Sequence, residues 1–422
     1  MTSSSATHPA GSWRQFLVYG GLAAAIICGS VLISLKAQDS KLVLQPEQRP
    51  IPASYFSLSI LFHPLNLKNV PWPAVPFGGW RLSHTNWADL EPQKDNFYFD
   101  LLDLYASWGQ EHHTDILMTL TFTPRWASQT PDAVTDSTPG LSGAPRDMDD
   151  WRKFVRAVAT RYKGRIHEYE IWNEPNRKKS WTGDIETLVT MTNEASRILK
   201  EVDPNNIVVS PPPTGPESFG FFKEFLSKGG AKNVDVIGYH FYTRHEDGPE
   251  AMVTMIQQVQ DLMRQYNVGP KPIWDTEAGW LGPDSYPPDK ASGYVARALI
   301  LNWAAGVERF YWYAWENHHG TQIELTEHNN ADLTPAGRAF VTIQRWMTGA
   351  VMKRCMTSAN HNWICELQKD GKTEYILWNP DGPVSFRISR DWHVSQVTQL
   401  AGGSGAIDGD SVSIGIDPVL LQ

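Results

Sequence analysis

The fold class of this chain follows from the stretch His167–Asn176, which reads HEYEIWNEPN. Its aromatic and β-branched residues favour a buried, pleated strand. Pro175 ends that strand, because proline has no N–H to donate to a neighbouring strand. Asn173 and Glu174 therefore come at the carboxyl end of the strand. An amide and a carboxylate side by side at a strand end predict a functional site.

A second stretch, Pro272–Trp280, has the same character and reads PIWDTEAGW. It predicts another strand that leads to a carboxylate, Glu277, with tryptophans on both sides. Asp275 competes with Glu277 for that position, because alternate residues of a strand share a face. Two carboxylates at separate strand ends, flanked by indoles, are what acid/base chemistry on a sugar requires.

Apolar runs and helix-like segments alternate from about residue 55 to about residue 349. The predicted strands are Phe56–Phe62, Gly79–Leu82, Asp115–Leu120, Glu168–Trp172, Ile207–Ser210, Val234–Tyr239, Lys271–Trp274 and Arg309–Trp312. The predicted helices are Phe99–Gln110, Trp151–Tyr162, Ile185–Val202, Ser218–Ser227, Glu250–Tyr266, Ala291–Ala305 and Pro335–Thr348. This alternation predicts an α/β fold, a (β/α)8 TIM barrel, whose sites lie at the carboxyl ends of the strands. Inside such a barrel, Glu168 and Glu170 would be interior polar residues.

The last part of the chain has a different pattern, with short alternating runs separated by Gly, Asp and Asn turns. It predicts a small antiparallel β domain, which the strand-like Leu42–Leu44 would join from the other end of the chain. We therefore divide the chain into a polar tail (1–16), an apolar segment (17–35), a linker (36–54), the barrel (55–349) and a β-rich accessory domain (350–422).

The apolar segment Leu17–Leu35 carries no charge. At about 1.5 Å per residue it is long enough to cross a hydrocarbon core of roughly 30 Å. It exceeds the usual apolar region of a signal peptide, roughly 7–15 residues. We expect an uncleaved transmembrane signal anchor, with a cleaved signal peptide as the alternative.

Composition excludes some classes of function. The net charge of −9 and the pI near 5.8 argue against a nucleic-acid partner, because no basic stripe offsets the acidity. The 18 tryptophans favour carbohydrate, since indole faces stack on sugar rings, but they also fill cores. No Cys/His cluster has metal-ligand spacing, so no metal or cofactor is predicted. Cys355 and Cys365 could form a disulfide across a hairpin or remain two buried thiols.

Three motifs together resemble the clan A glycoside hydrolases, which are retaining enzymes on a (β/α)8 barrel. They are Ile171–Asn176 (IWNEPN), Thr123–Ser128 (TPRWAS) and the Trp80–Pro92 region, with WR at its start and WADLEP at its end. Within the clan they look most like family 39, which holds β-xylosidases, α-iduronidases and exopolysaccharide glycosidases of the Psl type. The resemblance covers roughly residues 55–349.

This resemblance implies roles for individual residues. Glu174 would be the general acid/base and Glu277 the nucleophile. Arg81 and Tyr242 would keep Glu277 ionised, whereas an apolar wall and the charge of Glu277 would keep Glu174 protonated. The remaining substrate-binding candidates are Asn173 at the sugar 2-hydroxyl, His240 in the polar network, Trp315 as the floor under the sugar, and Trp126 as a platform.

The leading hypothesis is a retaining glycoside hydrolase that cleaves a polysaccharide or oligosaccharide, in particular a bacterial exopolysaccharide. We expect it to be anchored in the inner membrane with its barrel in the periplasm or outside the cell, beside polysaccharide export machinery. Two alternatives remain open: a non-catalytic carbohydrate-binding subunit of a polysaccharide biosynthesis or export machine, and a transglycosylase. Loss of a carboxylate or of Arg81 would indicate the binding subunit, but all three residues are present.

Overall fold

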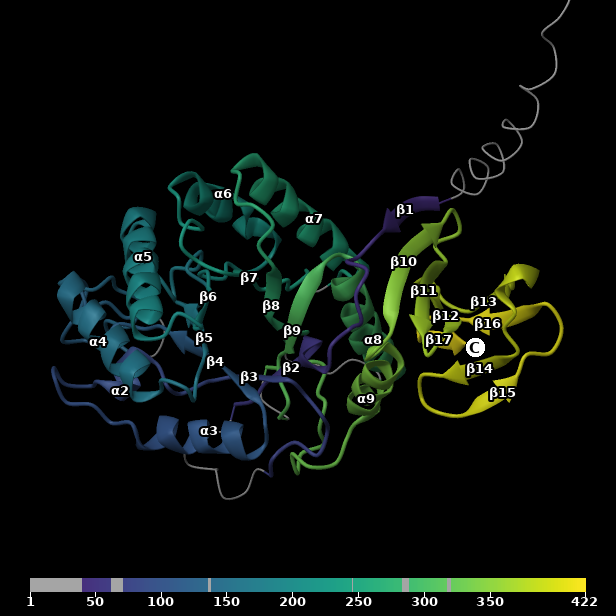
Figure 1. Ribbon diagram of the computed structural model, residues 1–422, viewed down its shortest axis with the longest axis horizontal. Coiled ribbons are helices and arrows are strands. Elements are labelled where there is room, and N and C mark those ends of the chain that lie inside the picture. The colour runs from purple at the N-terminus through teal and green to yellow at the C-terminus, as the bar shows by residue number, and fades with distance from the viewer. Residues whose placement is uncertain (1–39, 62–70, 136–137, 245, 283–287, 317–319) are drawn as a thin grey trace, which may run out of the picture.

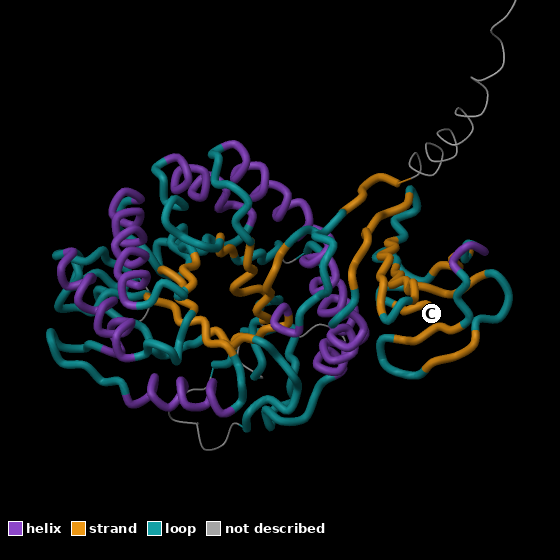
Figure 2. The backbone as a smooth tube through the Cα atoms, in the orientation of Figure 1, coloured by secondary structure: helices purple, strands orange, loops and turns teal. Residues whose placement is uncertain are grey.

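Parallel strands form a nearly closed barrel at the centre of the larger part of the molecule (Figure 2). The computed structural model describes residues 40–61, 71–135, 138–244, 246–282, 288–316 and 320–422. The barrel strands are β2 (Phe56–Ser59), β3 (Gly79–Arg81), β4 (Asp115–Leu120), β5 (Glu168–Ile171), β6 (Ile207–Val209), β7 (Ile237–Tyr239), β8 (Ile273–Ala278) and β9 (Val307–Trp312). Their order is β6-β5-β4-β3-β2-β9-β8-β7, and parallel bridges Val209–Val236 and Thr214–His240 join β6 to the β7 side. The predicted barrel is confirmed.

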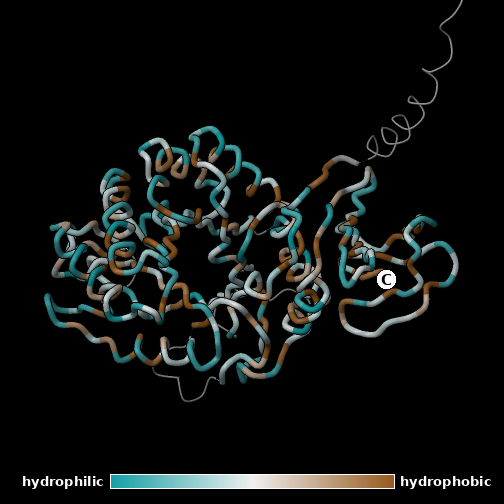
Figure 3. Tube along the Cα trace, viewed as in Figure 1, coloured by the Kyte–Doolittle hydropathy of each residue, from teal (hydrophilic) through white to brown (hydrophobic). Residues whose placement is uncertain are grey.

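Helices surround the strands (Figure 1). They are α3 (Asp100–Glu111), α4 (Met148–Arg161), α5 (Ile185–Val202), α6 (Phe219–Ser227), α7 (Glu250–Gln265), α8 (Pro288–Ala304) and α9 (Pro335–Met347), with a short α2 (Trp87–Leu90) after β3 and 3₁₀ turns at Ala53–Tyr55, Pro216–Ser218 and Arg390–Trp392. The start of α5 shows why the boundaries lie where they do. The Asp184 carboxylate accepts a hydrogen bond from the Thr187 N–H at 2.6 Å, which satisfies one free donor of the first turn. Hydrophobic and hydrophilic residues alternate along these helices, as one buried face requires (Figure 3).

The barrel interior holds ion pairs as well as apolar side chains. Glu168 and Glu170 on β5 are both buried, as predicted. Arg309 on β9 donates hydrogen bonds to both carboxylate oxygens of Glu168, at 2.8 and 2.7 Å. Glu170 instead binds Arg81 of β3. Each buried carboxylate therefore has its own arginine, which compensates part of the desolvation cost.

An antiparallel sheet follows the barrel in the sequence. Its strands, in spatial order, are β1 (Ser40–Leu44), β10 (Val351–Ser358), β11 (Trp363–Lys369), β12 (Lys372–Trp378), β17 (Val419–Leu421), β14 (Gln396–Gln399) and β15 (Ser404–Ala406). A separate pair consists of β13 (Val384–Arg387) and β16 (Ser411–Ile414). The predicted addition of Leu42–Leu44 is confirmed, since these residues pair with β10.

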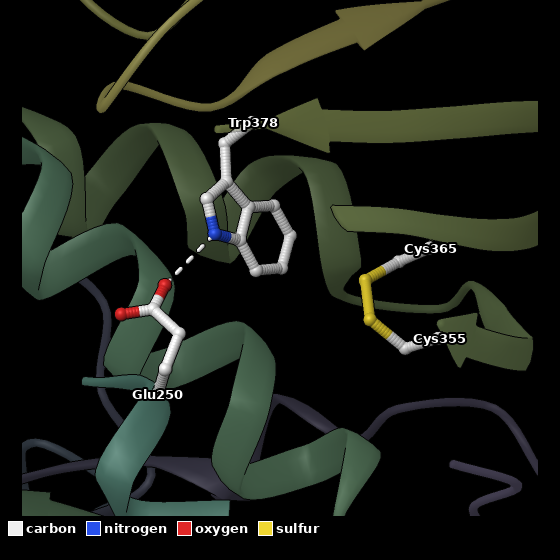
Figure 4. The surroundings of a disulfide bond; sticks show 4 residues. All are labelled: Glu250, Cys355, Cys365 and Trp378. Carbon is white, nitrogen blue, oxygen red and sulfur yellow. Dashed lines mark hydrogen bonds between the residues drawn. A yellow bond between two sulfur atoms is a disulfide. The ribbon is translucent and has the colours of Figure 1, made fainter. Parts of the chain in front are cut away.

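The antiparallel sheet is joined to the barrel by a partly buried polar contact (Figure 4). The indole Nε1 of Trp378 on β12 donates to Glu250 Oε1 at the start of α7, at 2.9 Å. Arg297 of α8 forms an ion pair with the same oxygen at 2.9 Å. The ring of Trp378 also stacks on Trp363, and both belong to the apolar cluster that includes the barrel core. One continuous core therefore holds the two parts together.

Cys355 on β10 and Cys365 on β11 face each other in register and form a disulfide (Figure 4). Both are fully buried. Of the two alternatives in the sequence, the structure therefore has the bonded pair. Such bonds are stable in oxidising compartments.

Replacing both cysteines with serine is expected to lower the free energy of unfolding by about 2–3 kcal/mol, because the bond closes a short loop and limits the unfolded chain. Urea unfolding of the variant beside the wild type measures this difference. Wild type treated with dithiothreitol should unfold at the same urea concentration as the variant, and an unchanged midpoint in both would contradict the prediction.

One predicted strand end differs from the structure, and one predicted segment lies outside it. The seventh barrel strand was predicted to end at Trp274, but β8 continues to Ala278, so Glu277 lies within the strand. The polar sequence Asp275–Glu277 hid this continuation, since Asp275 and Thr276 are buried despite their polar side chains. The predicted anchor Leu17–Leu35 lies outside the described residues. Among the helices that the structure describes, none is long and apolar enough to cross a membrane.

Candidate active site

The turn after β5 positions Asn173 and Glu174 by an unusual backbone. Trp172 and Glu174 have φ angles of 64° and 46°, in the left-handed region that larger residues rarely adopt. Each such residue costs on the order of 1–3 kcal/mol, so surrounding contacts must hold it in place. Trp172 is fully buried, and its Nε1 donates to the Ser180 carbonyl at 2.9 Å. The packed indole therefore fixes the two polar side chains beside it.

A bulge in β8 separates Glu277 from Asp275. Asp275 pairs with Phe310 and Ala278 with Trp312, so β8 has one more residue than β9 between these pairs. Bulges re-aim side chains and are common beside active sites. Asp275 is fully buried, and burial raises the pKa of its carboxyl well above the ordinary value. Glu277 lines a cavity, whereas Asp275 does not line any of the described cavities at this end of the barrel.

Glu174 and Glu277 lie side by side at the carboxyl ends of the strands. One carboxylate oxygen of each, together with a ring nitrogen of His240, lies within 4.8 Å of the others. Both carboxylates line a cavity of about 510 Å³, together with Tyr242 and Tyr313 among other residues. His240 is fully buried beside them, with its Nδ1 3.2 Å from Glu174 Oε1.

Arg81 connects the nucleophile candidate to the barrel interior. Its Nη1 donates to Glu277 Oε2 at 2.5 Å, and its Nε and Nη2 donate to Glu170 Oε1 at 2.9 and 2.7 Å. Nη2 also donates to Asn173 Oδ1 at 2.7 Å. Burial by itself would lower the pKa of Arg81, but the charges of Glu170 and Glu277 together have a larger effect in the opposite direction. The net pKa lies above the ordinary value, so the guanidinium stays charged. A fixed cation of this kind favours the ionised form of Glu277.

Tyr242 supplies a second hydrogen bond to Glu277. Its hydroxyl donates to Glu277 Oε1 at 2.9 Å. Burial raises the pKa of Tyr242 well above its ordinary value, so the hydroxyl keeps the proton that it donates. The two oxygens of Glu277 are therefore each bound by a donor, Arg81 on one and Tyr242 on the other.

Replacing Arg81 with methionine is expected to destabilise the fold by about 3–5 kcal/mol, because the fully buried Glu170 would lose its cation. Urea unfolding measures the change. Arg387→Met is a suitable control, since the Arg387 side chain is 80% exposed and its loss should change stability little. Equal midpoints for the two variants would contradict the structural role of Arg81.

The environment of Glu174 differs from the expectation. Burial raises the pKa of its carboxyl, but the hydrogen bond and positive charge of His240 and the charge of Arg177 lower it to about 2. Arg177 Nε lies 3.5 Å from Glu174 Oε2. The expected apolar wall and nearby negative charge are therefore outweighed by His240, which the sequence placed in the polar network, and by Arg177, which sequence reasoning did not identify. This low pKa favours the ionised form of Glu174 in the free protein.

A second cavity of about 270 Å³ lies on the Asn173 side of Glu277. Its lining is mostly neutral and polar: Ser83, His84, Thr85, Asn86, Thr119 and Thr121, with Arg81, Asn173 and Tyr313. Glu277 and Tyr313 line both cavities, so the two spaces meet at the carboxylate of Glu277. Molecules held in both cavities would meet at Glu277.

The structure places the predicted tryptophans elsewhere. Trp315 is 1% exposed and is not among the described residues that line either cavity, so its assignment as the floor under the sugar is wrong. Tyr313, the first residue after β9, lines both cavities instead. Trp126 packs against Trp87, and its Nε1 donates to the Glu91 carbonyl at 2.8 Å, away from both cavities. The Tyr313–Ala314 peptide bond is cis.

Glu174, His240 and Glu277 are also the one group of acidic and histidine side chains, among the described residues, with the spacing of a metal site. The charges around them suit a cation poorly. Arg81 already binds Glu277, and Arg177 lies beside Glu174. The group fits acid/base chemistry between two carboxylates better than metal binding.

Comparisons with known proteins agree with this geometry. The chain matches the family model described as glycosyl hydrolases family 39 over residues 89–313. No curated protein sequence matches the chain. A family 39 glycoside hydrolase from Bacteroides cellulosilyticus WH2 has a similar structure, with a TM-score of 0.69 and 16% identity, over 89% of this chain and 81% of that chain.

Two further structures share the fold. A monomeric beta-xylosidase from Caulobacter crescentus CB15 has a TM-score of 0.62 and 15% identity, over 89% of this chain and 97% of that chain. A glucosidase from Croceicoccus marinus has a TM-score of 0.61 and 14% identity, over 90% and 97%. At such identities the likeness shows the fold, whereas the family model spans more than half of the chain. The paired carboxylates thus lie in a barrel whose sequence belongs to glycosyl hydrolases family 39, and the chain is a glycoside hydrolase.

Proposed function

We propose that the protein cleaves glycosidic bonds with retention of configuration, with Glu277 as nucleophile and Glu174 as acid/base. One observation carries this proposal: oxygens of the two carboxylates lie within 4.8 Å of each other. Retaining glycosidases have carboxyl groups about 5–5.5 Å apart, whereas inverting enzymes need about 6.5–9.5 Å to admit a water molecule. Carboxylate oxygens this close to each other favour retention.

In the first step, an oxygen of Glu277 attacks the anomeric carbon while Glu174 gives a proton to the leaving oxygen. The bond to the leaving sugar breaks, and an ester between Glu277 and the remaining sugar forms. In the second step, Glu174 takes a proton from water, and the resulting oxygen nucleophile displaces Glu277. Asn173 faces the cavity of the sugar that is attacked, where its amide can bind the 2-hydroxyl.

Glu174 must hold a proton in the first step, although its pKa in the free protein is low. Substrate that fills the cavity would exclude water, and desolvation raises the pKa of a carboxyl group. His240 Nδ1 lies 3.2 Å from Glu174 Oε1 and holds that oxygen in place. His240 is therefore a positioning residue for the acid/base in this mechanism.

The substrate we propose is a polysaccharide, in particular a bacterial exopolysaccharide. Two cavities that meet at Glu277 support it, because they offer space for sugars on both sides of the cleaved bond. We also propose that the barrel works outside the cytoplasm, anchored by Leu17–Leu35 and beside export machinery. The uncharged length of that sequence and the Cys355–Cys365 disulfide support this location.

The test of retention is the anomeric form of the first product. Proton NMR during cleavage of an aryl glycoside should show the starting anomer before mutarotation. Appearance of the opposite anomer first would overturn the assignment of Glu277 as nucleophile. Products that carry a second sugar in place of water would show transfer rather than hydrolysis by the same two residues.

A further inference from the structure

Two cations line the larger cavity next to Glu174. Arg177 and Lys179 are both exposed and come from the same loop as Glu174, between β5 and α5. Glu174 and Glu277 are the only acidic side chains among the described residues that line this cavity. In the proposed mechanism, both of these carboxylates take part in the reaction.

Neither cation is paired with an acidic side chain other than the candidate acid/base Glu174 among the described residues. Within the described part of the chain, the ion pair of Arg177 is with Glu174, at 3.5 Å, and Lys179 has none. By contrast, Arg81 in the neighbouring cavity is bound by both Glu170 and Glu277. The larger cavity therefore offers the charge of Lys179 and that of Arg177, whose one carboxylate partner is 3.5 Å away. The smaller cavity offers hydroxyl and amide groups around an arginine that two glutamates neutralise.

Each cavity can be assigned to one side of the cleaved bond. This assignment rests on the proposed function. Asn173 and Glu277 hold the sugar whose anomeric carbon is attacked, so the smaller cavity takes that sugar. A general acid faces the leaving oxygen, and Arg177 approaches Glu174 Oε2 while His240 approaches Oε1. Arg177 and Lys179 therefore lie on the side of the leaving sugar.

We propose that the leaving-group side of the site binds a sugar with an anionic substituent, a carboxylate or a sulfate, through Arg177 and Lys179. The guanidinium offers a fork of N–H donors that matches such groups, and the ammonium adds a second charge. Free cations at a cleft also raise the local concentration of an anionic polymer. These two side chains determine which polysaccharide is cleaved fastest.

Binding of an anion would also assist the chemistry. In the free protein, the charge of Arg177 lowers the pKa of Glu174 and so opposes its protonation. An anion on the leaving sugar would compete for Arg177 and weaken that effect. An acidic substrate would thus favour protonation of Glu174, the general acid, whereas a neutral substrate would not.

The experiment compares matched polymers with the full chain. One series uses uronic-acid polysaccharides and the same polymers after reduction of their carboxyl groups. The other uses sulfated polysaccharides before and after desulfation. Release of reducing ends gives kcat/KM for the wild type, Arg177→Gln, Lys179→Gln, the double variant and the control Lys223→Gln, an exposed cation on α6.

The wild type should prefer the anionic form of one series by about tenfold or more, and each glutamine substitution should remove much of that preference. Lys223→Gln should retain it. Which series shows the preference distinguishes carboxylate from sulfate.

Equal cleavage of anionic and neutral forms, or a preference that survives in the double variant, would overturn the inference of anion binding. The proposed function would be unaffected by that result. No release of reducing ends from any polymer, or from aryl glycosides, would instead overturn the proposed function and the assignment of the leaving-group side with it.

Discussion

Glu277→Gln is expected to lower kcat by roughly 10⁴–10⁶-fold, the scale seen when a catalytic nucleophile is removed. The amide has nearly the shape of the carboxylate, and its oxygen can still accept the hydrogen bond that Arg81 Nη1 donates. It cannot form the ester to the anomeric carbon. Rates of release from an aryl glycoside that the wild type cleaves measure the loss.

Asp275→Asn is the matched control, because Asp275 was the competing carboxylate in the same strand. Burial already raises the pKa of its carboxyl, and it lies beneath the cavity rather than in it. Its replacement by the neutral amide should therefore change kcat far less. If Asp275→Asn were as inactive as Glu277→Gln while both remained folded by circular dichroism, the choice of nucleophile would be wrong.

The effect of Glu174→Gln on the reaction rate is expected to depend on the leaving group of the substrate. With a poor leaving group, kcat/KM should fall by about 10²–10⁴-fold, the usual contribution of general acid catalysis. A dinitrophenyl glycoside needs no proton on its leaving oxygen, so the first step should remain fast. The second step should be slow, since no base activates water, and the intermediate should accumulate.

Stopped-flow absorbance measures this as a burst of dinitrophenolate equal to the enzyme concentration. Azide, which needs no base, should restore steady turnover in Glu174→Gln and give a glycosyl azide. Glu224→Gln, a change at an exposed residue of α6, is the control and should show neither effect. An equal loss for both leaving groups would mean that Glu174 is not the acid/base.

Six residues predicted for the site lie close together because strand ends of a parallel barrel converge. Arg81, Asn173, Glu174, His240, Tyr242 and Glu277 come from β3, β5, β7 and β8 or the turns after them, and the structure brings them together. Positions at the carboxyl ends of such strands must share one face of the barrel. Fold class alone therefore gives their proximity.

Prediction was weaker where a side chain can turn either inward or toward the opening. Trp315 and Tyr313 both follow β9, and the sequence does not tell which one faces the cavity. The backbone after the strand buries Trp315 and exposes Tyr313 to both cavities. A search for the first aromatic residue after the strand, rather than for tryptophan, would have found Tyr313.

By itself, the sequence determined the barrel, the antiparallel sheet with its extra strand Leu42–Leu44, and the pair of glutamates. These depend on periodicity, on strand ends and on local motifs, which are short-range properties of the chain. Only the tertiary structure decided the charge around Glu174, the bulge that separates Glu277 from Asp275, and the two cavities of different polarity. These depend on distances between residues far apart in sequence, because electrostatic and packing energies are set by three-dimensional separation and burial.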